Sequence, residues 1–303
     1  MNNDWQVYPR NHKRTLKQLP PPPPWRRLGA EGAEQRAQSY LPSEKAIEAI
    51  NAALYLRRPL LVRGNPGVGK SSLAFSVAHQ LELGPVLHWP VSSSSLLRDA
   101  LYRYDAIGRL QAVQVGKPGD IDGFVELGPV GTAYASSRLR VLLIDEIDKG
   151  DIDLPNDLLN VLEDRWFEIP ELRRETRDFD VIDSERNPVR VKEGRVNCGE
   201  QPLVIMTDNM LRDFPPAFKR RCLHLEIKPP DEPELMTIVQ RHFPGVELPQ
   251  LETLIQDFLS MSKTKRLSTD QLLNAVYLTL HVPQRNPFEI KDPLGDIVLS
   301  PND

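Results

Sequence analysis

The chain has 303 residues, of which 40% are hydrophobic and 26% are charged, and its formal net charge is −4. This composition is typical of a soluble globular protein, and the length allows two domains with sizeable cores. The mild acidity argues against a dedicated nucleic-acid binder, whose domain is usually distinctly basic, so we do not expect nucleic acid as a partner.

The cysteine content and the hydropathy of the chain indicate which cellular compartment to expect. Cys198 and Cys222 have no CxxC or histidine spacing, which disfavours a zinc site and is compatible with a reducing compartment. No apolar run is long enough to predict a membrane span, and residues 1–19 lack the apolar centre of a signal peptide. We therefore expect a cytoplasmic protein with no membrane partner.

Residues 1–42 are predicted to form an N-terminal arm. After a polar and basic start, the run "PPPPPW" ends at Trp25 and favours a stiff polyproline II segment. Two interpretations are open for this segment. It is either a rigid arm that packs on the surface of a domain through Trp25, or a docking peptide for a partner.

The next elements alternate between helices and strands. Ser43 is a predicted N-cap of a helix that Pro59 ends. A buried strand, a glycine-rich loop and a second helix follow. Beyond them we predict a strand, a helix and a polar, glycine-bearing segment. The strands lie at 59–64 and 85–91, the helices at 69–83 and 96–113, and the polar segment at 114–131.

The second half of the chain changes character twice. The apolar run "RVLLIDEID" at 140–148 predicts a strand, and a helix at 153–165 follows it. The charged segment 163–200 has short alternating pieces that predict a β-hairpin near 166–200. After a strand at 202–209, only helices are predicted, at 231–243, 248–263 and 268–281. The alternation of short strands and helices implies a parallel sheet covered on both faces.

The stretch "GNPGVGKS" satisfies the pattern G-x-x-x-x-G-K-[ST] between a strand and a helix. Its glycines let the backbone turn and direct amide groups at phosphate oxygens. Lys70 is placed to reach the β- and γ-phosphates, and the Ser71 hydroxyl to ligate Mg²⁺. The predicted nucleotide-binding residues of this loop are Gly64, Asn65, Pro66, Gly67, Val68, Gly69, Lys70, Ser71 and Ser72.

Two acidic residues, Asp145 and Glu146, lie in the carboxyl-terminal part of the predicted strand at 140–148. Asp145 lies at its carboxyl end, where ligands of open α/β sheets bind, and would hold Mg²⁺ together with Ser71. Glu146 is placed to orient and deprotonate an attacking water, which favours ATP hydrolysis over GTP hydrolysis. Asp148 and Lys149 are interpreted as an ordinary surface pair.

The motifs "GNPGVGKS", "VLLIDEIDK", "VIMTDN" and "AFKRRC", followed by helices, resemble an AAA+ ATPase of the MoxR-like group. The resemblance covers residues 43–281. It implies a P-loop NTPase of the AAA+ fold, with a parallel sheet flanked by helices and a smaller all-α lid. The implied domains are an ATP-binding domain at 43–228, a lid at 229–283 and a tail at 284–303. The features that point to the MoxR-like group are an insertion near 105–130 and the hairpin near 166–200, which is longer than the group would lead us to expect.

The resemblance also implies roles for single residues. Asn209 falls on the sensor-1 position, with Asp208 and Thr207 as weaker candidates. Arg266 falls on the sensor-2 position, with Lys265 as its competitor. An arginine finger, which acts on the nucleotide of a neighbouring subunit, falls on Arg221. Arg220 is second to it and Lys219 third.

The resemblance finally implies a function. It predicts an Mg²⁺-dependent ATPase that binds ATP, assembles into a homo-oligomeric ring, expected to be a hexamer, and remodels a protein partner such as one with a von Willebrand factor A domain. An alternative is a nucleotide-gated scaffold or switch in a bacterial defence or signalling system, with little turnover. A DNA-loading AAA+ protein is disfavoured by the acidic balance, and a nucleotide kinase by the lack of a recognisable acceptor site.

Overall fold

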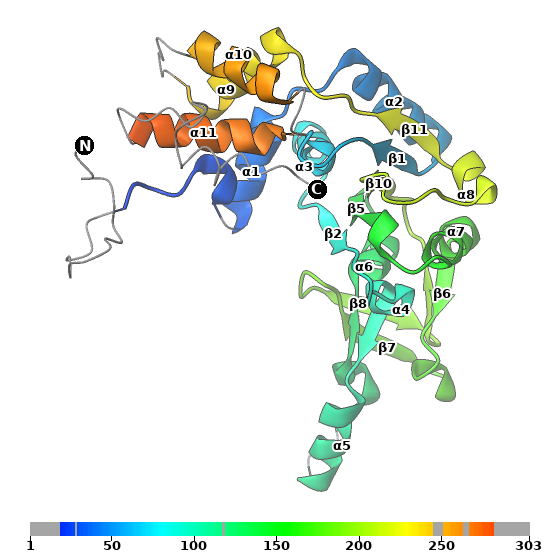
Figure 1. The fold of residues 1–303 in the computed structure, drawn as a ribbon. Helices are drawn as coiled ribbons and strands as arrows, with labels where there is room; N and C mark the ends of the chain where they lie inside the picture. Colours follow the sequence, from blue (N-terminus) through cyan, green and yellow to red (C-terminus); the bar gives the residue numbers. More distant parts are fainter. Residues whose placement is uncertain (1–18, 28, 117–118, 245–250, 263–266, 282–303) are drawn as a thin grey trace. The chain divides into compact units, whose positions relative to one another are not determined.

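The computed structural model describes residues 19–27, 29–116, 119–244, 251–262 and 267–281 (Figure 1). It divides into two compact units. An α/β unit contains residues 40–65 and 69–228. A helical unit contains the described residues before 40 and after 228, with residues 66–68 grouped with it.

Five parallel strands form the central sheet of the α/β unit. They are apolar because both faces of the sheet are covered by other elements. In β10, for example, every residue is buried. The strands are, in their order across the sheet, β11 (Leu223–Glu226), β1 (Leu60–Arg63), β10 (Leu203–Asp208), β5 (Val141–Asp145) and β2 (Leu87–Pro90).

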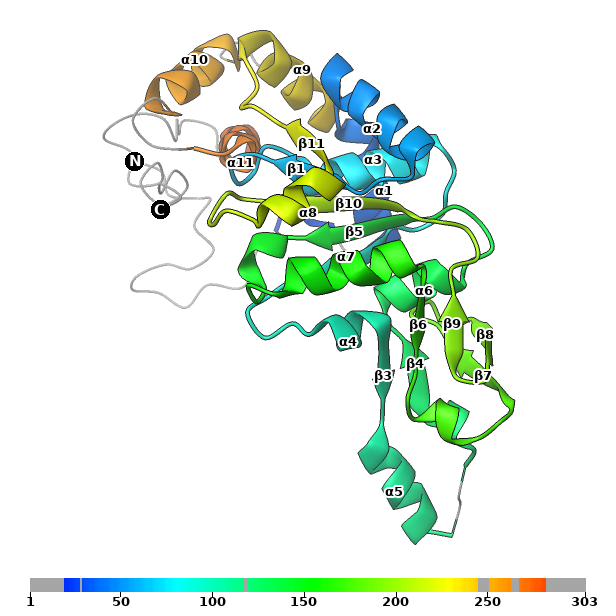
Figure 2. The same ribbon diagram turned by 90° about the vertical axis from the view of Figure 1, so that its right-hand side faces the viewer.

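Helices cover the two faces of the central sheet (Figure 2). Leu60 and Val62 of β1 pack with side chains of α2 (Glu44–Leu56) and α3 (Lys70–Gln80). Leu61 points to the other face, where α6 (Pro129–Ala135), α7 (Leu154–Asp164) and α8 (Pro216–Arg221) contribute to the core. This period-two alternation is what a strand buried on both sides requires. The predicted α/β fold with a parallel sheet is confirmed.

A second, six-stranded sheet, called the inserted sheet below, joins two segments that are distant in sequence. The predicted hairpin near 166–200 is present as the antiparallel pair β7–β8. The sequence did not predict that the insertion near 105–130 joins it, through a parallel pairing of Glu126 with Ile182. The order is β3 (Tyr102–Tyr104), β4 (Val125–Leu127), β7 (Asp178–Ile182), β8 (Pro188–Lys192), β9 (Arg195–Asn197) and β6 (Trp166–Glu168).

The single helix predicted at 96–113 is wrong. The structure has α4 (Leu97–Leu101), then β3, then α5 (Ala106–Gln114). Tyr102 is buried and pairs with Leu127 of β4, a partner that helical periodicity cannot reveal. Asp105 then caps the new helix by accepting a hydrogen bond from the Gly108 amide at 2.8 Å.

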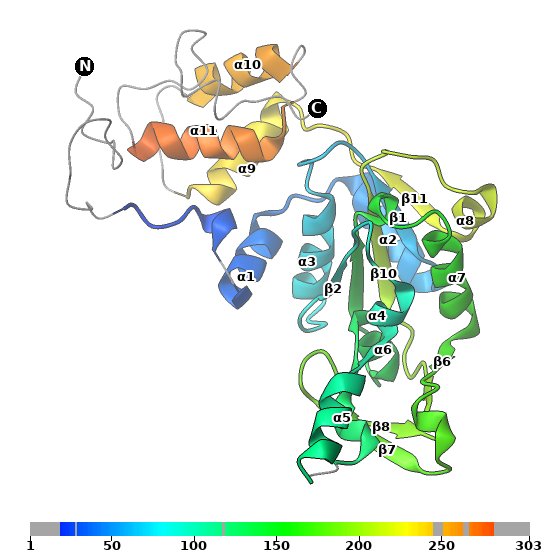
Figure 3. The same ribbon diagram turned by 60° about the horizontal axis from the view of Figure 1, so that its bottom comes forward.

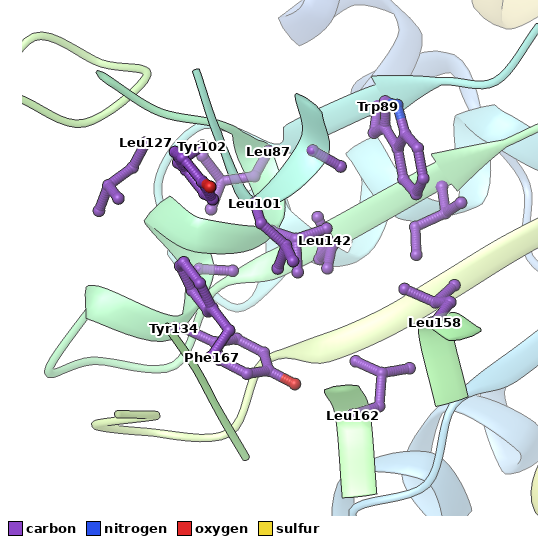
Figure 4. Close-up of a cluster of buried hydrophobic side chains, with 14 of the residues drawn as sticks. Leu87, Trp89, Leu101, Tyr102, Leu127, Tyr134, Leu142, Leu158, Leu162 and Phe167 are labelled. Atoms are coloured by element: carbon purple, nitrogen blue, oxygen red, sulfur yellow. The ribbon is translucent and has the colours of Figure 1, made fainter. Parts of the chain in front are cut away.

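Aromatic side chains join the inserted sheet to the core of the α/β unit (Figure 4). Phe167 of β6 stacks on Tyr102 at 6.5 Å between ring centroids and lies 6.2 Å from Tyr134 of α6. Helix α6 leads into β5, so the inserted sheet lies on the side where the central strands begin (Figure 3). The short 3-10 helices of this unit are η2 (Ile121–Phe124), η3 (Ile147–Lys149) and η4 (Leu172–Arg174).

The helical unit contains the three predicted C-terminal helices. The first of them begins with a capping box between Asp231 and Glu234, as its sequence favours. Two elements before residue 40, including a helix that the sequence did not predict, belong to the same unit. The elements are η1 (Pro24–Arg26), α1 (Gly29–Ser39), α9 (Glu232–His242), α10 (Leu251–Ser262) and α11 (Thr269–His281). No described helix is long and apolar enough to cross a membrane.

The proline-rich segment packs on the helical unit through Trp25. The indole ring makes edge contacts with His242, Phe243 and Tyr277, at 5.6 to 6.1 Å between centroids. The hydroxyl of Tyr277 donates a hydrogen bond to the carbonyl of Pro21. The segment therefore packs on the surface of a domain through Trp25, as the first of the two interpretations predicted. The limits of the domains at 42 and 228 stay predictions, as does the tail at 284–303, which lies outside the described residues.

We expect acid to destabilise this packing. Burial lowers the pKa of His242 below its ordinary value of 6.5, although the carbonyl of Ile238 and the charge of Asp270 oppose the shift. Because the folded-state pKa is depressed, the stability is fully present above pH 6.5 and is lost as the pH falls towards the lower folded-state value. Thermal unfolding between about pH 8 and about pH 5 should show a falling midpoint, and His242→Gln should reduce that fall. An equal fall in the variant would contradict the prediction.

Candidate functional site

The glycine-rich loop connects β1 to α3, as predicted. Gly67 and Gly69 have φ angles of 76° and 91°, in the left-handed region that favours glycine. A Cβ atom on Gly69 would lie 3.1 Å from the ring of Tyr40, so a side chain there would also crowd that ring. Residues 64–69 form the loop, and Lys70, Ser71 and Ser72 begin α3. The free amides at this helix start are suited to an anion.

Lys70 is buried beneath the loop, with 6% of its surface exposed. Its Nζ donates hydrogen bonds to the carbonyls of Gly64 and Asn65, each at 2.8 Å. Burial lowers the pKa of Lys70, while the negative charges of Asp148 and Asp145 oppose the shift. The ammonium group is therefore held by loop carbonyls that phosphate oxygens could replace.

Asp145, at the end of β5, connects three other elements. Its Oδ1 accepts hydrogen bonds from the Ser71 hydroxyl at 2.7 Å and the Thr207 hydroxyl at 2.5 Å. Its Oδ2 lies 3.3 Å from Nε2 of His88. Burial opposes ionisation of Asp145, but the hydrogen bonds from His88, Thr207 and Ser71 outweigh it and hold the pKa below its ordinary value. The structure thus brings the two predicted metal-binding residues together.

Glu146 has a left-handed backbone, with φ of 58°. Such a conformation is costly for a residue with a side chain and is commonest at functional sites. The Glu146 amide donates to Thr207 Oγ1 at 2.7 Å. One carboxylate oxygen accepts from Asn209 Nδ2 at 3.2 Å, and the other accepts from Lys149 Nζ at 2.7 Å. The predicted base and the predicted sensor-1 residue are therefore in direct contact.

Asp148 is not the surface residue that the sequence suggested. Only 4% of it is exposed, and Lys149 pairs with Glu146 instead. Asp148 Oδ2 accepts hydrogen bonds from the amides of Asn209 at 3.0 Å and Leu211 at 3.2 Å. The surface-pair interpretation was wrong because the chain turns inward through η3, which no local pattern signals. Asp148 holds the loop that carries Asn209.

Replacing Asp148 with alanine should remove the acceptor of two amides, those of the half-buried Asn209 and the exposed Leu211. We expect the free energy of unfolding to fall by about 1–3 kcal/mol. Asp148→Asn keeps an acceptor oxygen and should cost less. Denaturant titration of both variants beside wild type measures the difference, and equal losses would show that the hydrogen bonds of the Asn209 loop are not the cause.

The sequence did not indicate Arg63 and His88 as residues of this site, and it named Asp208 and Thr207 only as weaker sensor-1 candidates. Arg63 donates from Nε to the fully buried Asp208 at 2.7 Å, and the two residues are register partners on β1 and β10. Burial raises the pKa of Asp208, although that ion pair favours its charged form. His88 and Thr207 reach Asp145 from β2 and β10. Each lies near the carboxyl end of a predicted strand, but only the order of the strands makes them neighbours.

The donors at the site fit Mg²⁺ bound with a nucleotide. Ser71 and Asp145 supply one hydroxyl and one carboxylate that already meet at 2.7 Å. Mg²⁺ usually keeps several waters and binds one or two carboxylates plus phosphate oxygens. Among the described residues there is no cluster of three or more His, Cys, Asp or Glu suited to a metal. A metal held by the chain alone is thus not indicated there.

The arginines of α8 lie away from this loop. Helix α8 leads into β11, whose first residue pairs with Leu60 at the beginning of β1, whereas the loop follows the end of β1. Nε of Arg221 is 2.6 Å from Glu163, and Lys219 pairs with Asp213 at 2.8 Å. The described part of the chain offers Arg220 no ion pair. The structure does not bring Arg220 or Arg221 to the nucleotide loop of their own unit.

The predicted sensor-2 residues, Arg266 and its competitor Lys265, lie outside the described residues. The structure does bring together the other parts of the predicted site: Asp145 contacts Ser71 at the end of the loop, and Glu146 contacts Asn209.

Comparisons with known proteins were made for the whole chain. Residues 59–222, more than half of the chain, match the model of the AAA domain of the dynein-related subfamily. No curated protein sequence matches. Among solved structures, the chain is similar to the crystal structure of NtrX from Brucella abortus in complex with ADP. The identity is 13%, the TM-score is 0.47, and the match covers 89% of this chain and 56% of the NtrX chain, so this chain spans little over half of that protein.

Proposed function

The chain belongs to the dynein-related subfamily of AAA domains, and from this premise we propose that it is an Mg²⁺-dependent ATPase of the MoxR-like AAA+ type. The AAA domain implies ATP binding and hydrolysis. The finer proposal is that the protein assembles into a ring, which we expect to be a hexamer, and remodels a protein partner. A partner with a von Willebrand factor A domain is the one that the MoxR-like resemblance suggests.

The observation that carries the proposal is the meeting of Ser71, Asp145, Glu146 and Asn209. They come from α3, from β5 and the residue after it, and from the turn after β10. Hydrogen bonds at 2.7 Å and 3.2 Å connect them in two pairs, Ser71 with Asp145 and Asn209 with Glu146. A metal-binding pair beside a carboxylate with an amide partner is the set that hydrolysis of a phosphoanhydride needs.

We assign the following roles to the chain's own groups. Backbone amides of residues 64–70, other than Pro66, bind phosphate oxygens, and Lys70 exchanges its loop carbonyls for the β- and γ-phosphates. Ser71 and Asp145 would hold Mg²⁺, which when bound neutralises phosphate charge. Glu146 accepts the proton of the attacking water, and Asn209 keeps its carboxylate in place. Each carboxylate oxygen of Glu146 accepts one hydrogen bond in the structure, so each keeps capacity for a water.

Ring assembly is supported by the position of the α8 arginines. Because Arg221 and Arg220 lie away from their own loop, either one can act on a nucleotide only if a second subunit presents it. A finger supplied by a neighbour makes hydrolysis dependent on assembly. Electron microscopy with a slowly hydrolysed ATP analogue tests this proposal. Rings that form with the analogue support it, and a monomer that hydrolyses ATP at a concentration-independent rate contradicts it.

The alternative function is a nucleotide-gated scaffold with little turnover. Steady-state release of phosphate from Mg²⁺-ATP separates the two functions. Turnover above that of Lys70→Ala supports the motor. Ring formation with ATP but without turnover favours the scaffold.

A further inference from the structure

A pocket of about 610 Å³ lies on the inserted sheet, on the side where the central strands begin. It is formed by α4, β3 and α5 together with Ile121 of η2 and two residues near η4. Arginine is its most frequent lining residue. The basic and aromatic lining residues are Arg98, Arg103, Arg109, Arg174, Tyr102 and Tyr104.

The four arginines of this pocket lack carboxylate partners. None of them has an Asp or Glu oxygen within 4 Å among the described residues. Four other arginines of the inserted region do have one: Arg173, Arg177, Arg186 and Arg190. Guanidinium groups gathered in one place repel one another, and in a chain of net charge −4 acidic partners are not scarce. The unpaired set is thus complementary to an external anion.

The acidic groups of the pocket do not pair with these arginines. Glu171 accepts a hydrogen bond from the Tyr102 hydroxyl at 2.9 Å, and the remaining acid of the lining is Asp99. Arg109 donates to the Tyr104 hydroxyl at 3.2 Å, which leaves most of its five donors unused. Arg98, Arg103 and Arg174 are exposed.

An exposed apolar stripe adjoins the pocket. Ile107, Leu110 and Val113 lie three residues apart on α5 and are 71%, 59% and 54% exposed. Helix α5 has no buried residue, and it extends away from the rest of the α/β unit (Figure 2). Two of its residues, Ala106 and Arg109, line the pocket. The ligand must therefore offer apolar groups as well as negative charge.

This combination favours a protein segment over a nucleic acid. Single strands bind by stacking their bases on open aromatic faces. Tyr102 is only 5% exposed and already stacks on Phe167, and Tyr104 is half-buried with its hydroxyl engaged. We propose that the arginine pocket and the α5 stripe together bind an acidic, amphipathic segment of a partner protein. Its carboxylates pair with the four arginines, and its apolar side chains cover α5. Binding of this kind needs no hydrolysis and does not depend on the proposed ATPase function.

Fluorescence anisotropy of the full chain tests the inference. The probe is a labelled synthetic helix with Glu along one face and Leu along the other. We expect binding that weakens as salt is added, and that is lost when every Glu of the probe is replaced with Gln. Arg103→Ala combined with Arg174→Ala should weaken binding at least about tenfold, and Leu110→Ala should weaken it several-fold.

Arg190→Ala is the matched control, because this arginine of the same sheet is paired with Asp180 at 2.9 Å. It should bind the probe as wild type does, and ATP turnover should be unchanged in all these variants. Absence of binding to wild type, or an equal loss in Arg190→Ala, would overturn the inference. So would a single-stranded oligonucleotide that binds more tightly than the peptide and depends on the same arginines.

Discussion

Replacing Glu146 with glutamine is expected to lower the rate of ATP hydrolysis by about 10²- to 10⁴-fold while nucleotide binding persists. Glutamine keeps the size of the side chain and can still accept from Asn209, but it cannot accept the proton of the attacking water. The loop carrying Lys70 and the Ser71–Asp145 contact are not altered. Phosphate release measures the rate, and titration with a fluorescent ATP analogue measures binding.

The matched control is Glu226→Gln. Glu226 is an exposed residue on β11 and has no ion pair among the described residues. It should hydrolyse ATP at the wild-type rate. If Glu146→Gln turns over as fast as this control, Glu146 is not the general base. If both variants and wild type show negligible rates, the scaffold function is favoured.

Replacing Arg221 with alanine is expected to lower hydrolysis by on the order of 10³-fold or more, again with nucleotide binding retained. A guanidinium offers a planar, permanently charged fork for the charge that develops on the γ-phosphoryl group. Arg221 is paired with Glu163 at 2.6 Å, and both side chains are about half exposed. An exposed pair of this kind contributes roughly 0–1 kcal/mol, so it does not prevent Arg221 from moving to a nucleotide.

Three further variants make this prediction specific. Glu163→Gln removes the partner of Arg221 and should leave the rate intact, which separates the finger from the ion pair. Lys219→Ala should also be neutral. Normal hydrolysis in Arg221→Ala together with loss in Arg220→Ala would move the finger to Arg220. Normal hydrolysis in both would exclude a finger on α8.

Mixing two inactive variants tests whether the arginine acts between subunits. Lys70→Ala subunits cannot use their own loop but still present Arg221. Arg221→Ala subunits keep the loop. If the arginine acts across an interface, mixing should restore part of the activity, because some loops then face an intact arginine. No recovery in assemblies shown to contain both variants would contradict an arginine that acts across an interface.

Local sequence was enough for the parts of the site that are continuous in the chain. The loop at 64–71 needs glycines, a lysine and a serine at fixed spacing, and its strand and helix show their own periodicity. The acids at 145 and 146 follow a wholly apolar strand, so their place at a sheet edge was predictable. The capped start of α2 at Ser43 was also predictable, because a cap involves residues only three positions apart.

Only the tertiary structure decided which of these parts meet. The order of the central strands puts Thr207 and His88 on Asp145, and the turn through η3 buries Asp148 under the loop of Asn209. Pairing of β4 with β7 joins two apparent insertions into one sheet, and pairing of β3 with β4 interrupts a predicted helix at Tyr102. Strand pairing and burial are long-range: their free energy comes from residues far apart in the chain, and no window of sequence contains both partners.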